Sequence, residues 1–193
     1  MPLDLTAMFT MHDALRRELE HLARVDDDPR LVFRTAGWRR FKQAVWGHHC
    51  AEDEVLWPAL RLRLTDQPGN LVVLEAMEAE HAAIGQLIAT IDEAASGPQG
   101  CLVHLGDLID SLVTGLKGHL AHEEEAVIPL LQQALTAGQW AAFEKVHSEL
   151  TADTLSAPDG WSPAAMTGPR QRRDWTGSEC LSNEENPEEG KQR

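Results

Sequence analysis

Tyrosine is absent from this chain of 193 residues, and cysteine is scarce. Without tyrosine there can be no phenolate metal ligand and no tyrosyl radical, whatever the chain binds. The three cysteines stand far apart, at Cys50, Cys101 and Cys180, which is neither a disulfide framework nor a zinc–thiolate pattern. We therefore expect a protein of the reducing cytoplasm, in which Cys50 and Cys101 serve as small apolar side chains.

Basic residues and long apolar runs are also in short supply. Lys and Arg number 17 against 31 Asp and Glu, which gives a net charge of −14. This balance argues against binding to nucleic acid phosphates or to an anionic membrane surface. No apolar run is long enough to suggest a membrane span, and the first residues lack the basic region of a signal peptide. We expect a cytoplasmic protein with no nucleic acid or membrane partner, and the sequence identifies no protein partner.

Apolar residues recur at steps of three and four in four long segments, at about 4–25, 31–64, 71–95 and 101–135. Runs of Asp, Pro and Gly separate these segments, and no segment alternates with a period of two. Thr136 could cap a shorter fifth helix, about 137–151, whose Trp140, Phe143 and Val146 would cover one end or side. The sequence predicts an all-α fold, an up-down-up-down four-helix bundle with a short fifth helix.

The helical periodicity stops at Ser156. Beyond it, proline and glycine interrupt a polar and charged sequence that lacks an apolar stripe. We expect one domain at residues 1–155 and a disordered tail at 156–193. Trp161 and Trp175 are expected to be exposed there, and the alternative is that they dock the tail on the body or on a partner.

A short pattern occurs twice: histidine, then glutamate four residues later, then proline six residues after the glutamate. The two copies begin at His48 and His119, and their glutamates are Glu52 and Glu123. Residues four apart lie on one helix face, about 5–6 Å apart at Cβ, so the pair can bind one metal ion or part of a metal pair. A solvated helix face with a chance histidine is the alternative for a single copy, and the repetition favours metal.

His12 and His81 each interrupt the apolar stripe of the helix that precedes one of these copies. A lone histidine in such a stripe is more often a core residue bonded to a backbone carbonyl, but matching places in two half-repeats favour metal ligands. Glu52 and Glu123 would be costly as unpaired buried charges, and dications remove that cost. Four histidines and two glutamates suit two ions, with iron first, manganese second and zinc third.

A helical projection places the other titratable residues away from the predicted ligand positions. His49 lies about 100° around the helix from His48, and His122 about 60° from His119, so we expect both behind the ligands or on the surface. We interpret Asp53, Glu54, Glu124 and Glu125 as outer-face charges and assign no function to His21, His104 and His147.

Taken together, these segments resemble hemerythrin-like proteins of the HHE cation-binding type, over about residues 6–135. The matching segments are Arg16–Leu19 after His12, HHxxE with Leu56-Trp57-Pro58, Glu80-His81, and HxxxEE with Ile128-Pro129. The resemblance implies a four-helix bundle with a non-haem di-iron site. It implies His12, His48, His81 and His119 as terminal ligands, with Glu52 and Glu123 bridging the irons.

Two departures from the oxygen-carrying hemerythrins bear on function. Those proteins have a further histidine four residues after the third-helix histidine, where this chain has Gly85, and an aspartate where it has Glu124. Gly85 would leave space beside the iron at His81, which favours further reaction of peroxide over release of oxygen. We therefore expect a di-iron protein that reacts with hydrogen peroxide or dioxygen, with catalase-like peroxide decomposition favoured. The alternatives are a non-catalytic module that binds or senses oxygen, nitric oxide or iron, and a purely structural bundle with core histidines.

Overall fold

The structure, a computed structural model, describes residues 2–23, 33, 36–96 and 104–155, and every regular element in these ranges is helical. None of the described helices is both long enough and apolar enough to cross a membrane. The expected tail from Ser156 onward, with Trp161 and Trp175, lies outside the described residues. The domain boundary at residue 155 therefore stays a prediction.

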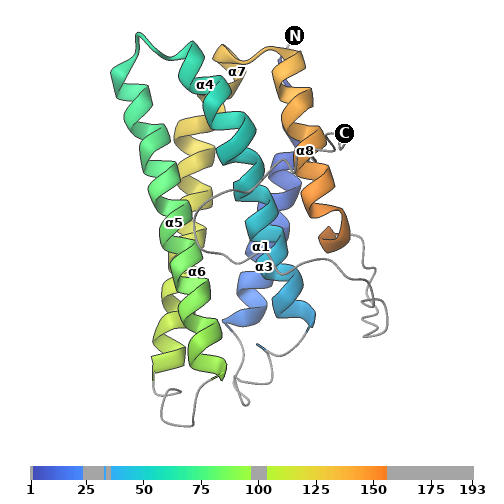
Figure 1. The fold of residues 1–193 in the computed structure, drawn as a ribbon, viewed down its shortest axis with the longest axis vertical. Coiled ribbons are helices and arrows are strands. Elements are labelled where there is room, and N and C mark those ends of the chain that lie inside the picture. Colours follow the sequence, from blue (N-terminus) through green and yellow to red (C-terminus); the bar gives the residue numbers. More distant parts are fainter. Residues whose placement is uncertain (1, 24–32, 34–35, 97–103, 156–193) are drawn as a thin grey trace, which may run out of the picture.

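Four antiparallel rods form the bundle, as the apolar periodicity predicts (Figure 1). In chain order they are α1 (Thr6–Leu22); α3 (Ala36–Ala51), η1 (Glu52–Leu56) and α4 (Trp57–Arg63); α5 (Pro68–Ser96); and α6 (Leu105–His122), η3 (Glu123–Val127) and α7 (Ile128–Ala134). The all-helical, up-down-up-down architecture predicted from the sequence is confirmed.

Two apolar clusters fill the bundle, one towards each end. One cluster includes Leu15, Leu19, Val45, Ile88 and Leu112, and the other includes Met8, Leu56, Trp57, Leu74 and Leu131. These side chains are almost completely buried, so truncating any of the leucines to alanine would cost about 2–5 kcal/mol. The buried polar side chains occupy the layer between the two clusters, so apolar packing fixes that layer from both sides.

The second and fourth rods each contain one π-helical turn, and each turn begins at a glutamate of the repeated pattern. The backbone N–H of Trp57 donates to the carbonyl of Glu52, five residues earlier, and Ile128 donates to Glu123 in the same way. The residue after each donor is a proline, which lacks an N–H group and would clash with the carbonyl four residues before it. The wider turn accommodates the proline, so Pro58 does not end its rod, and the helix continues as α4.

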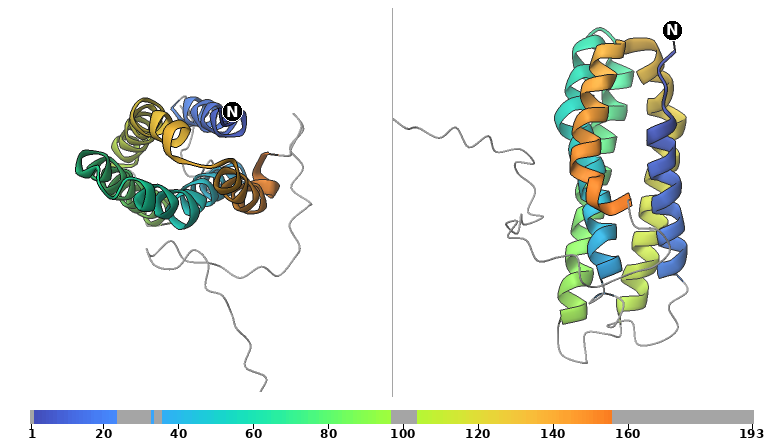
Figure 2. Two further views of the ribbon diagram at one scale, coloured as in Figure 1. Left: turned by 90° about the horizontal axis from the view of Figure 1, so that it is seen from above. Right: turned by 90° about the vertical axis from the view of Figure 1, so that its right-hand side faces the viewer.

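The fifth helix, α8 (Ala137–Leu155), lies along α3 and covers a side of the bundle rather than an end (Figure 2). Thr136 caps it as predicted: its Oγ1 accepts from the Gln139 N–H at 3.3 Å, and the Gln139 side chain accepts from the Thr136 N–H at 3.1 Å. Trp140 and Phe143 are buried in the second apolar cluster. The Trp140 Nε1–H also donates to the Asp4 carbonyl at 3.0 Å, which ties α8 to the start of the chain.

Candidate metal centre

One group of inward-facing donors comes from three rods at the middle of the bundle. Donor atoms of His12 on α1, His48 on α3, Glu52 on η1 and Glu123 on η3 all lie within 4.8 Å of one another. The Nε2 atoms of His12 and His48 are 3.0 Å apart. The Nε2 of His12 lies 3.2 Å from Glu123, and that of His48 lies 3.4 Å from Glu52. Nitrogen and oxygen donors that converge on one point are the arrangement that binds a transition-metal ion.

A second group lies beside the first and contains three imidazoles. Donor atoms of His49, His81 and His119 lie within 4.8 Å of one another. The rings of His49 and His81 stack with centroids 3.9 Å apart, and His119 meets His81 edge-on at 4.7 Å. Glu52 reaches both groups, since one carboxylate oxygen lies 3.4 Å from His48 Nε2 and the other 3.4 Å from His81 Nε2. That placement is the one a bridging carboxylate needs.

Most inward atoms of both groups are buried and have no partner outside the cluster. Apart from the contacts of 3.2–3.4 Å among the cluster's own histidines and glutamates, no hydrogen-bond partner within the described residues reaches the carboxylate oxygens of Glu52 and Glu123, the ring nitrogens of His49, or the Nε2 of His81 and His119. Each unsatisfied buried polar group costs about 1–3 kcal/mol, and a buried carboxylate costs more. Cations coordinated at this point would satisfy the two carboxylates, the Nε2 atoms of His81 and His119 and one nitrogen of His49, so the residues present fit a pair of metal ions.

The pKa values of the cluster show how strongly it attracts positive charge. Burial disfavours the charged form of His12, but the hydrogen bond and charge of Glu123 outweigh it and raise the pKa of His12 to about 9. Burial likewise opposes charge on His81, yet Asp53 and Glu52 raise its pKa to about 10. Burial and the charge of Glu123 raise the pKa of Glu52 to about 8. Without metal, the cluster therefore retains protons where cations would be favoured.

The remaining imidazoles of the cluster are held neutral. Burial, followed by the charge of neighbouring imidazoles, holds the pKa of His48 and of His49 well below the ordinary value. Burial and the charge of His81 also lower the pKa of His119. A neutral imidazole is the form that binds a metal, so these three rings are already in the ligating state.

Carboxylates orient three of the histidines from outside. The Nδ1 atoms are bonded at 2.8 Å in each of the pairs His12–Glu124, His81–Asp53 and His119–Glu80. In the neutral form of each histidine, the Nδ1–H donates to the carboxylate, and the lone pair of Nε2 is then free to face inward. Arg16 in turn contacts Glu124 at 2.8 Å and holds its carboxylate in place.

The expectation that Asp53 and Glu124 are outer-face charges is wrong, because each bonds a histidine of the cluster. Both residues lie within the π turns η1 and η3. A helical projection assumes 3.6 residues per turn, and the wider π turn changes the direction in which the following side chains point. The signal that could have located them is the proline that follows each glutamate.

The projection also misplaced His49. Its side chain is 4 % exposed, so a surface position is excluded, and its ring lies among the inward donors rather than behind them. The α3 rod has neighbours on two sides: His48 faces α1, while the next residue, His49, faces α5 and α6. His122 lies on the rim, where it is bonded at 2.8 Å to Glu80, the carboxylate that also holds His119.

His147 and Cys50, for which the sequence predicts no role in the site, also lie in or near this region. His147 on α8 has its Nε2 3.2 Å from the Nδ1 of His48, and burial lowers the pKa of His147 to about 4. Cys50, expected as a plain apolar side chain, is buried and disulfide-bonded, and the other two cysteines lie outside the described residues. His21 and His104 are largely exposed, at 70 % and 79 %, and stay without a role.

A four-helix bundle whose rods turn histidines and glutamates inward at mid-height is a metal-binding bundle. The hemerythrin HHE cation binding domain matches residues 3–131, and the chain belongs to this family. The match places the chain among metal-binding modules, typically of iron, and its histidine and glutamate cluster fits that assignment. Comparison with curated proteins and with solved structures gives no match. The match ends before α8 begins, so α8 lies outside the part that the family defines.

Proposed function

We propose that this chain is a non-haem di-iron protein that binds dioxygen or hydrogen peroxide. The observation that supports it is the pair of adjacent donor groups joined by Glu52. One ion would be held by His12 and His48, and the other by His49, His81 and His119, with Glu52 and Glu123 between them. Iron bound there would supply the redox chemistry by which either small molecule is taken up.

The two halves of the centre are unequal, and this inequality favours binding at one ion. The pattern repeats after 71 residues, so the counterpart of His49 is Leu120, which is fully buried and offers no donor atom. The His81 side therefore has three imidazoles and the His12 side has two. With both Glu52 and Glu123 shared, the ion at His12 and His48 would have four protein ligands and its neighbour five, so the first would keep a position for an exogenous ligand.

This inequality supports reversible binding of dioxygen, or of nitric oxide, as the first candidate. Gly85 would favour peroxide turnover if it left the His81 side one imidazole short, but the ring of His49 lies against His81. Peroxide decomposition is the second candidate, favoured by the buried position of Gly85, one turn after His81 and without a side chain. In both cases the chain positions the donors and excludes water from them by burial.

The two candidates are separated by exposing the anaerobically reduced iron protein to dioxygen and, separately, to hydrogen peroxide. Reversible binding predicts a visible spectrum that appears with oxygen, bleaches under vacuum and returns on re-exposure. Turnover predicts sustained evolution of oxygen from peroxide and no reversible spectrum. His49→Leu should abolish the reversible spectrum, because it removes a donor from the three-imidazole group, whereas the exposed His104→Ala should keep it. If reduced iron-loaded protein responds to neither molecule, the proposal is wrong.

A further inference from the structure

The fifth helix packs tightly against the second rod beside a ligand histidine. A Cβ placed on Gly47 of α3 would lie 3.0 Å from the Leu150 carbonyl oxygen and 3.1 Å from side-chain atoms of Leu150 and Thr151, all on α8. Gly47 immediately precedes His48. Only a residue without a side chain lets the two backbones approach this closely. Gly47 therefore fixes where α8 packs on α3, next to the metal centre.

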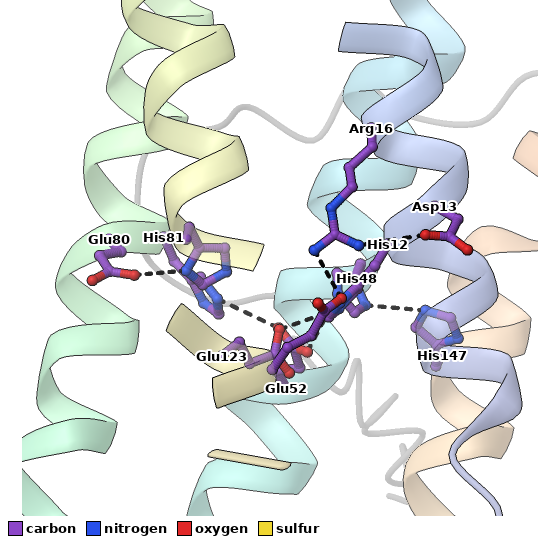
Figure 3. Close-up of polar contacts among 11 residues, drawn as sticks. His12, Asp13, Arg16, His48, Glu52, Glu80, His81, Glu123 and His147 are labelled. Atoms are coloured by element: carbon purple, nitrogen blue, oxygen red, sulfur yellow. Dashed lines mark hydrogen bonds and ion pairs between the residues drawn. The ribbon is translucent and has the colours of Figure 1, made fainter. Parts of the chain in front are cut away.

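The same contact brings one side chain of α8 against a ligand. The Nε2 of His147 lies 3.2 Å from the Nδ1 of His48, and both side chains are buried (Figure 3). The Nε2 of His48 faces the donor group, so its Nδ1 carries the proton and donates to His147. Phe143 stacks on the His147 ring at 5.4 Å, which holds the acceptor in position from within α8.

This partner differs in charge from the other three. The Nδ1–H groups of His12, His81 and His119 donate to carboxylates, whereas that of His48 donates to a neutral imidazole. A carboxylate draws the proton and makes the histidine a stronger donor to the metal, while a neutral acceptor does so less. The His12 and His48 side, which has fewer imidazoles, therefore also contains the less strongly polarised ligand.

We propose that α8 is part of the metal centre and that His147 is a positioning residue. His147 orients His48 and would keep the reduction potential of the adjacent iron high. The proposal rests on the di-iron centre proposed above. It extends the functional unit beyond residue 131, where the family match ends, to Leu155. The neutral acceptor favours the ferrous state of that iron, because it adds less electron density to His48 than a carboxylate would.

The packing of α8 against Gly47 is tested by comparing substitutions at two glycines that occupy equivalent positions in the two half-repeats. Gly47 precedes His48, and Gly118 precedes His119 and has no atom within 4 Å of its added Cβ. In the full chain, Gly47→Ala should lower the melting temperature of the metal-free protein and weaken iron binding. Gly118→Ala should lower neither. Equal melting temperatures and equal iron binding in the two variants would overturn the claim that α8 packs on the bundle through Gly47.

The role of His147 is tested by replacing it with acceptors of different charge. His147→Gln keeps a neutral acceptor and should retain iron affinity and midpoint potential. His147→Leu removes the acceptor and should weaken iron binding by about 10–100-fold. His147→Glu supplies a carboxylate and should shift the midpoint potential downward at unchanged iron content.

The midpoint potentials of His147→Gln and His147→Glu test the positioning role of His147 even if His147→Leu fails to fold. Equal midpoint potentials in the Gln and Glu variants would overturn the positioning role while leaving the di-iron centre in place. A parent chain that binds no iron under anaerobic loading would overturn the di-iron centre and this role together. His104→Ala, at the exposed residue that precedes α6, serves as the histidine control and should change neither quantity.

Discussion

The imidazole rings of His49 and His81 lie parallel, 5° apart in plane and 3.9 Å apart at their centroids. The first ring comes from α3 and the second from α5, so the stack joins the second and third rods at the level of the site. His49 has no hydrogen-bond partner among the described residues for either ring nitrogen. A buried imidazole in that state is explained if one of its nitrogens binds a metal.

His49→Leu should therefore reduce the iron content from about two ions per chain towards one, because the three-imidazole group loses a donor. The replacement is apolar and of similar size, so the bundle should keep its helicity. Metal analysis after anaerobic loading and desalting measures the content. His104→Ala is the control and should match the parent, and an unchanged iron content in His49→Leu would show that this ring is not a ligand.

Glu52→Gln should have opposite effects on the metal-free and iron-loaded forms. Burial and Glu123 disfavour the charged form of Glu52, so at pH 8 the neutral amide should stabilise the metal-free protein by about 1–3 kcal/mol. The amide is a poorer metal ligand, so iron binding should weaken sharply. Thermal melts with and without iron measure both effects. A metal-free variant that is less stable than the parent would contradict the assigned electrostatics.

Stability of the metal-free chain should pass through a maximum near pH 6.5. The raised pKa values of His12, His81 and Glu52 give stability that is present at lower pH and lost as the pH rises through about 9, 10 and 8. The lowered pKa values of His48, His49, His119 and His147 give stability that is lost as the pH falls below the ordinary histidine value. Denaturant melts from pH 5 to pH 10 would follow both limbs.

Iron should change the acidic limb of that profile. Ligand imidazoles must be deprotonated to bind metal, so iron should dissociate as the pH falls below about 6. Since a ligand bound only by the native state stabilises it, the melting temperature should fall at the same pH at which iron is released. An iron-loaded protein that melts at the temperature of the metal-free protein would contradict binding at the folded site.

Asp53→Asn should weaken iron binding by about 10–100-fold, because the amide holds the Nδ1–H of His81 less strongly than the carboxylate does. The matched control is Asp66→Asn, which changes an exposed aspartate in the turn between α4 and α5. Competition with a chelator of known affinity measures the difference. Equal affinities in the two variants would show that Asp53 is a surface charge, as the helical projection predicts.

The sequence was sufficient for the rods and for the residues whose spacing is regular. Steps of three and four predict the stripes, and the repeated His-x-x-x-Glu places His48, Glu52, His119 and Glu123 inward. Asp53 and Glu124 could not be found this way, because their direction depends on the π turns that Pro58 and Pro129 induce. His147 could not be found at all, because its contact with His48 joins residues 99 apart through the packing of α8.

The two adjacent donor groups, joined by Glu52, are proposed to bind a pair of iron ions. Anaerobic titration of the metal-free chain with ferrous iron measures this stoichiometry, with the bound iron counted after desalting. The parent should saturate at about two ions per chain. In Glu52→Ala, binding should fall far below that value, because both groups lose a shared oxygen. Saturation at one ion or none in the parent, or an unchanged value in Glu52→Ala, would contradict the paired centre.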